Sequence, residues 1–179
     1  MKIAASLVLV VLVSLSGCSD SHPAAKPNTQ AGTAVSTLPD SFKLSAEPSG
    51  AVVASQVRAT AKTGDNVVIV GRVGRYSVVD PFADGFASFT IVDQKMKPCG
   101  EDGMDGCKTP WDYCCADADE MKASTVNIEF RDAKGKPHST SARGFHGIVP
   151  LATVVVTGKA EKDEAGNLII AATGVFVRP

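Results

Sequence analysis

The chain lacks the features that would place it directly in several functional classes. Its 18 Lys and Arg nearly cancel its 19 Asp and Glu over 179 residues, so no excess of basic charge points to nucleic acid. Aromatic residues make up 6% of the chain, and there are three histidines. It contains no G-x-S-x-G, H-E-x-x-H or phosphate-binding glycine motif. We therefore predict a protein that is not an enzyme.

The chain also lacks an apolar run that could cross a bilayer as a helix, which needs about 20 residues. Its longest apolar run, Ile3 to Leu15, follows the basic Lys2 and is interrupted only by serines. A short apolar run with a basic start and small residues at its end is typical of a secretory signal peptide. The sequence thus predicts a signal peptide over residues 1–17 and export of the rest.

The end of this segment, Leu15-Ser-Gly-Cys18, resembles the lipobox of bacterial lipoproteins; an ordinary secretory signal that happens to end near a cysteine is the alternative. The resemblance implies cleavage after Gly17 and acyl chains, such as palmitate, on Cys18. Several acyl chains would hold the protein on a membrane of the bacterial cell envelope. Within this family, Ser19 after the cysteine favours the periplasm-facing outer membrane over the inner membrane.

Composition then divides the exported part in two. Residues 18–48 combine the lipidated cysteine with a stretch rich in Pro, Ser, Thr and Ala and poor in large apolar side chains. Such a stretch cannot bury enough surface to offset chain entropy, so it predicts a flexible tether. Residues 49–179 are long enough for one domain with a modest core.

The domain is predicted to be mainly β. A short helix is expected over Val52–Lys62, where apolar residues recur at helical spacing. Clean alternation of apolar and polar residues, or runs rich in Val and Ile, then predict strands. Glycines inside the first of these strands indicate a bulge or a sharp bend. The expected strands are Asn66–Arg75, Phe86–Val92, Thr125–Arg131, Ala152–Lys159 and Leu168–Val177, the last two forming a hairpin.

Five strands with a long first strand, an interruption after the second and a terminal hairpin describe a small OB-like barrel. The runs Asn66-Val-Val-Ile-Val-Gly-Arg-Val, Ala87-Ser-Phe-Thr-Ile-Val-Asp93 and Val155-Val-Thr-Gly158 resemble the strand rhythm of OB-fold domains in exported bacterial proteins. This resemblance covers most of residues 64–178.

Four cysteines besides Cys18 share one long loop, about 94–121, that interrupts the barrel. In an exported protein, an even set of cysteines predicts a disulfide framework first. A ring closed by the adjacent pair would be strained, which leaves two connectivities open. The four cysteines are Cys99, Cys107, Cys114 and Cys115.

A thiolate site for zinc or copper is the alternative for these cysteines, favoured by the acidic residues of the same loop. The spacing C-x7-C-x6-C-C contains no close C-x2-C pair and matches no known zinc motif, so no cofactor is the first expectation. Trp111, the chain's one tryptophan, is predicted to pack the loop onto the barrel; the alternative is a stacking platform for a ligand.

The segments Asp80-Pro-Phe and Cys107-Lys-Thr-Pro-Trp-Asp-Tyr-Cys-Cys115 are the most distinctive of the domain. They resemble a group of planctomycete-type bacterial lipoproteins that carry this cysteine segment between barrel strands. That group implies no particular activity.

Together these features predict a non-catalytic binding or interaction module, held on the membrane by lipid, with an envelope protein, peptide or glycan as partner and nucleic acid disfavoured. The alternative is a lipoprotein that handles zinc or copper through the cysteine loop. The polar strand face is interpreted first as a plain solvent face, and a ligand-binding face is the alternative. The candidate ligand residues are Ser88, Thr90, Asn127, Glu129, Arg131 and Trp111.

Overall fold

The computed structural model describes residues 38–76, 79–101, 109 and 111–179. The predicted signal peptide, the predicted lipidation site Cys18, and Cys107 therefore lie outside the described residues. Within the described ranges, no helix is both long and apolar enough to span a membrane.

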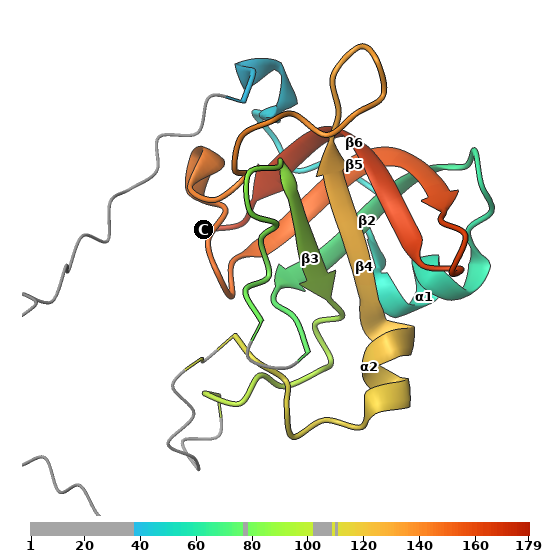
Figure 1. Ribbon diagram of the computed structural model, residues 1–179, viewed down its shortest axis with the longest axis vertical. Coiled ribbons are helices and arrows are strands. Elements are labelled where there is room, and N and C mark those ends of the chain that lie inside the picture. The colour runs from blue at the N-terminus through green and yellow to red at the C-terminus, as the bar shows by residue number, and fades with distance from the viewer. Residues whose placement is uncertain (1–37, 77–78, 102–108, 110) are drawn as a thin grey trace, which may run out of the picture. The chain divides into compact units, whose positions relative to one another are not determined.

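Five strands close into a barrel, as predicted (Figure 1). They are β2 (Asn66–Val73), β3 (Ser88–Val92), β4 (Thr125–Phe130), β5 (Thr153–Lys162) and β6 (Leu168–Val177). The order around the barrel is β2-β3-β4-β6-β5, and β5 pairs back with β2. β4 and β6 run parallel, and the other neighbours in the barrel run antiparallel. A two-residue strand, β1 (Val52–Val53), adds to β2 in parallel. The mainly β, OB-like fold is confirmed.

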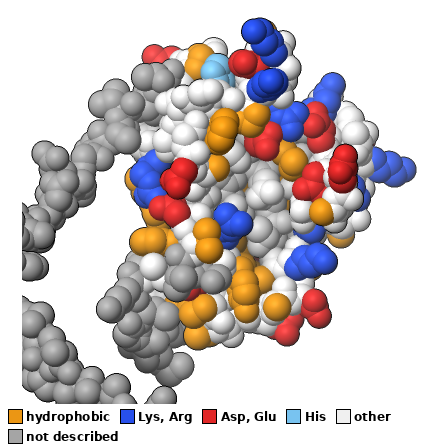
Figure 2. Space-filling model, viewed as in Figure 1, with side chains coloured by type: hydrophobic (Ala, Val, Ile, Leu, Met, Phe, Trp, Pro, Cys, Tyr) orange, Lys and Arg blue, Asp and Glu red, His pale blue; other side chains and the backbone are white. Residues whose placement is uncertain are grey.

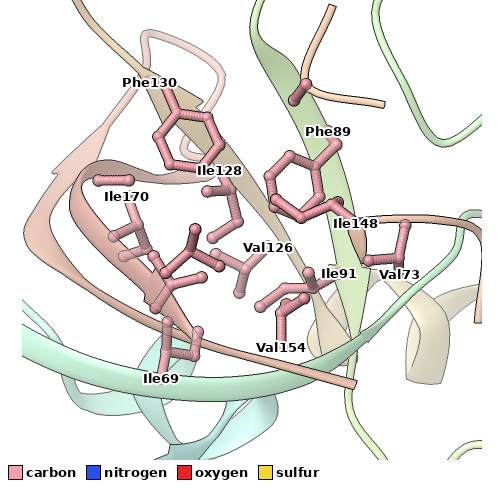
Figure 3. Packing of buried hydrophobic residues seen from close by; sticks show 14 of the residues in the cluster. Ile69, Val73, Phe89, Ile91, Val126, Ile128, Phe130, Ile148, Val154 and Ile170 are labelled. Carbon is pink, nitrogen blue, oxygen red and sulfur yellow. The ribbon is translucent and has the colours of Figure 1, made fainter. Parts of the chain in front are cut away.

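The core lies inside this barrel and follows the alternation of the sequence. In β4 the apolar residues Val126, Ile128 and Phe130 are buried, while the polar residues between them are half-buried on the outer face. The buried side chains meet those of the other strands, including Ile69 of β2 and Phe89 of β3 (Figure 3). Each such side chain contributes about 1.5–3 kcal/mol by leaving water.

Glycines allow the strands to approach one another closely. A Cβ on Gly158 would lie 2.5 Å from the carbonyl oxygen of Ala171, and one on Gly71 would lie 2.9 Å from Cδ1 of Ile91. The bulge expected in the first strand lies elsewhere: β2 and β5 pair in register through Gly71, and the register shift falls between Thr157 and Gly158, where β5 pairs with β6. Gly71 is therefore needed for close packing.

A flexible tether was predicted over residues 18–48, and this prediction is wrong for its C-terminal end, which packs on the barrel. Leu38 is buried, and the ring of Phe42 lies 4.9 Å from that of Phe130. Leu44 donates a backbone hydrogen bond to Val175 of β6 at 2.9 Å. A short 3-10 helix, η1 (Asp40–Phe42), belongs to this segment. A few well-spaced apolar side chains dock the chain here, although the average composition indicates a flexible segment.

Two short α-helices flank the barrel. α1 (Ala54–Thr60) lies within the predicted helix but is shorter. α2 (Ala118–Ser124) occupies the end of the predicted cysteine loop and was not predicted. The carboxylate of Asp117 accepts hydrogen bonds from the backbone of Asp119 and Glu120, at 3.0 and 2.9 Å, which caps the helix. The connection from β4 to β5 contains a second 3-10 helix, η2 (Phe145–Gly147).

The buried carboxylate of Asp93 joins α1 to the end of β3. It accepts hydrogen bonds from the backbone nitrogen and the hydroxyl of Ser55, at 3.0 and 2.5 Å, and from the backbone of Lys95 at 3.0 Å. Burial acts to raise the pKa of Asp93, but the hydrogen bonds from Ser55 and Lys95 outweigh it and hold the pKa below its ordinary value. The ionised carboxylate thus fixes the first turn of α1.

We predict that Asp93→Ala lowers the free energy of unfolding by about 2 kcal/mol. The amide and the hydroxyl of Ser55 would both lose the carboxylate that accepts their hydrogen bonds. Since the pKa of Asp93 is depressed in the folded state, its contribution is present above the unfolded pKa of about 4 and is lost as the pH falls through the folded value. Chemical denaturation at neutral and acidic pH measures both effects. An equal destabilisation at all pH values would contradict this role.

Candidate functional site

A cleft of about 370 Å³ opens on the polar strand face that the sequence offered as a possible ligand face. Its walls come from α1, α2, β3 and β4, from the segment after β2 and from the turn between β5 and β6. In OB folds, the face of the second and third barrel strands and the first and last connecting loops form the usual binding surface. Here those strands are β3 and β4, so the cleft occupies that surface.

The cleft is basic. Arg58 of α1, Arg75 after β2 and Lys122 of α2 line it, and no Asp or Glu is among its described lining residues. Arg58 is held in place, because its Nη1 donates a hydrogen bond to the carbonyl oxygen of Thr125 at 3.1 Å. Arg75 and Lys122 are exposed. Figure 2 shows separate Lys and Arg side chains on either side of a largely white area in the middle of this face.

Polar groups complete the cleft between the cations. The hydroxyl of Thr90 donates to Oδ1 of Asn127 across the β3–β4 pair at 3.3 Å. Asn167, at the β5–β6 turn, donates to the carboxylate of Asp163 from its backbone and side-chain nitrogens, at 2.7 and 2.9 Å. These hydrogen bonds lower the pKa of Asp163 and hold Asn167 in place. Tyr76, which is 41% exposed, presents an aromatic side chain at the cleft.

The structure brings two of the six predicted ligand residues into the cleft, Thr90 and Asn127. Ser88 pairs with Glu129 farther along the same strands, and neither lines it. Arg131 forms ion pairs of 2.7 Å with Glu129 and with Glu161. The charged end of the predicted face is therefore occupied by internal ion pairs.

Sequence reasoning missed the basic residues of the cleft because its candidates came from the second and third strands, with Trp111 as the one loop residue. Arg75 and Asn167 follow β2 and precede β6, in the two loops that OB folds commonly use. That general rule could have identified them. Lys122 could not be placed, since α2 itself was not predicted.

Beside the cleft, the cysteine loop is anchored to the barrel by Tyr113. Its side chain is 1% exposed and packs directly against Gly74. A Cβ at that position would lie 2.7 Å from the Tyr113 ring. Tyr113 forms a second buried cluster with Val92, Met96 and Met121, and Met121 also lines the cleft. One cluster therefore contacts both the cysteine loop and the cleft.

Trp111 lies half-buried next to this cluster and outside the cleft lining. Its carbonyl oxygen accepts a hydrogen bond of 3.5 Å from the backbone of Arg75. The contact links the loop to the barrel through the main chain. The packing of its indole on the barrel stays a prediction.

The sulfur atoms of Cys99, Cys114 and Cys115 all lie within 4.8 Å of one another. The separation is 3.3 Å between Cys99 and Cys114 and 3.9 Å between Cys114 and Cys115. A disulfide bond requires about 2.05 Å, so no two of these three sulfurs are at bonding distance. The predicted disulfide framework stays a prediction, because Cys107 lies outside the described residues.

The histidines that the structure describes lie away from both features. Nε2 of His146 is 2.8 Å from a carboxylate oxygen of Asp40, which is 89% exposed. The ring of His138 stands edge-on to that of Phe42, with 5.9 Å between centroids. Both contacts help to dock the N-terminal segment onto the barrel.

No protein-family model and no curated protein matches the chain. The cleft and the thiol cluster are therefore the features of the protein that bear on its function.

Burial raises the pKa of Tyr113 to about 12 from the ordinary value of 10.0, because the phenolate would be formed away from water. The unfolded chain therefore loses this proton first, and the contribution of Tyr113 to stability is lost as the pH rises from about 10 to about 12.

We predict that the unfolding free energy of the natural protein falls by about 2–3 kcal/mol more than that of Tyr113→Phe over this range. Denaturant titrations at several alkaline pH values measure the difference. Parallel losses in the two proteins would show that Tyr113 is not buried as described.

Proposed function

We propose that this protein is a non-catalytic binding module of the bacterial cell envelope, tethered by lipid on Cys18, that holds an anionic ligand in the basic cleft. The signal segment and the lipobox resemblance support the location. The cleft supports the function, and it is the observation that carries the proposal.

Three cations around one cleft without a carboxylate among the described lining residues favour a negatively charged ligand. The polar groups of Thr90, Asn127 and Asn167 offer hydrogen bonds that orient such a ligand. If the cations of the cleft were engaged in internal ion pairs, they would not attract a ligand. The ion pairs of the strand face lie at Arg131, outside the cleft.

Among anionic ligands, a carboxylated or sulfated oligosaccharide fits better than single-stranded nucleic acid. OB folds bind both kinds of polymer on this face. Nucleic acid binding relies on several stacking aromatics, whereas Tyr76 is the sole aromatic residue among the described lining residues. The predicted export also favours a glycan of the envelope.

The test is a binding titration with an oligogalacturonate, which carries one carboxylate per sugar, against a neutral maltooligosaccharide of equal length. We expect binding of the charged sugar alone, weakened by added salt. Arg75→Ala and Lys122→Ala should each raise its dissociation constant about tenfold, because each removes a desolvated charge contact of about 1.4 kcal/mol.

Lys134→Ala provides the matched control, because Lys134 is an exposed cation in the turn after β4 and does not line the cleft. Its affinity for oligogalacturonate should equal that of the natural protein. Equal affinity in all the variants, or tighter binding of a single-stranded oligonucleotide than of the sugar, would refute the proposal.

A further inference from the structure

The thiol cluster is separate from the cleft and has its own chemistry. Cys99 is buried at 7% exposure, whereas Cys114 and Cys115 are exposed in a turn. None of the three lines the cleft. Cys114 and Cys115 lie at the surface, where an incoming ion can reach them.

The spacing of the sulfurs fits metal coordination. With metal–sulfur bonds of about 2.3 Å, tetrahedral ligation places sulfurs about 3.8 Å apart. The separations of 3.3 and 3.9 Å, with all three sulfurs inside 4.8 Å, need shifts of a few tenths of an ångström to about one ångström to match. The adjacent pair, Cys114 and Cys115, has the 3.9 Å separation, so its turn spans two corners of a coordination polyhedron.

The backbone holds this arrangement together. The amide nitrogen of Cys99 donates a hydrogen bond of 2.8 Å to the carbonyl oxygen of Asp112, which keeps the two ends of the loop side by side. The backbone of Asp112 in turn pairs with that of Arg75, just after β2, as an isolated β-bridge. The next residue, Tyr113, is packed on the barrel. Cys99, and Cys114 next to Tyr113, are thus held close to a rigid part of the fold, as a preformed site requires.

A second observation points to a cation in this loop. The Asp112 side chain is fully buried, and neither of its carboxylate oxygens has a hydrogen-bond partner within the described part of the chain. A buried carboxylate without compensation is costly, and a bound cation nearby would offset that cost. The flanking sequence adds acidic charge, since Lys108 is the single basic residue between Cys99 and Glu120.

We propose that Cys99, Cys114 and Cys115 form a binding site for one soft, thiophilic cation of the Cu⁺ or Zn²⁺ kind. Thiolate ligands select these ions over Mg²⁺ or Ca²⁺. Binding displaces the thiol protons into solvent, so affinity rises with pH. The exposed pair lets the ion enter and leave, while the buried Cys99 anchors it.

The test begins with the full chain, purified with its thiols reduced and metal-free. It is titrated separately with Zn²⁺ and with Cu⁺ against a chelator selective for each. We expect one ion per chain, three thiols protected from alkylation by the bound ion, and thiolate-to-metal charge-transfer absorption with Co²⁺ as a spectroscopic substitute for Zn²⁺. The ion with the lower dissociation constant in these two titrations is the one that the site selects.

Cys99→Ser, Cys114→Ser and Cys115→Ser should each weaken binding tenfold or more. Met96→Leu is the matched control: it removes the sulfur of a buried residue that packs against Tyr113 and should leave the stoichiometry and affinity unchanged. Circular dichroism shows whether each variant is folded, and the alkylation measurement on the natural chain does not depend on any variant.

Two results would overturn the proposal. One is failure of the reduced natural chain to bind either ion. The other is protein recovered from the envelope whose intact mass shows no metal and whose peptide map shows a Cys99–Cys114 disulfide; the 3.3 Å separation makes this pair the competing linkage. Neither result would affect the anionic ligand of the cleft, which is tested by Arg75→Ala.

Discussion

The packing of Tyr113 against Gly74 is the contact on which the two functional features depend. It lets the cysteine loop lie directly on the end of β2, because only a glycine leaves room for the ring. The next residue along the chain, Cys114, belongs to the thiol cluster. The next residue after Gly74 is Arg75, which lines the cleft. A single apolar contact therefore positions a thiol on one side and a cation on the other.

This arrangement links the two sites physically. Met121 packs in the same cluster as Tyr113 and also contributes to the cleft from α2. Closing the loop, by a metal ion or by disulfides, reduces the number of conformations that Tyr113 and α2 can adopt.

The barrel could be predicted from the sequence because its strands carry strong periodic signals. The alternation in Thr125–Phe130 specifies one buried face, and the final two strands are joined by a polar turn with a glycine. The docking of Leu38 and Phe42 on the barrel could not be predicted, since apolar residues are few in this segment and their partners, such as Phe130, are distant in sequence. The cleft was only half predicted for the same reason: Thr90 and Asn127 belong to strands, but Arg58 and Lys122 come from helices whose placement depends on tertiary contacts. The short separations among the thiols likewise follow from the fold, because the sequence favoured a disulfide framework and left a metal site as the alternative.

The central claim is that the face of β3 and β4 binds an anionic ligand between two helices and two loops. Chemical-shift mapping of the ¹⁵N-labelled protein during titration with oligogalacturonate tests it most directly. The account predicts that the largest shifts fall on the amides of Tyr76, Asn127 and Asn167, with those of Lys43 to Ser45 on a separate pocket unchanged. Shifts confined to the second pocket, or spread evenly over exposed lysines, would contradict it.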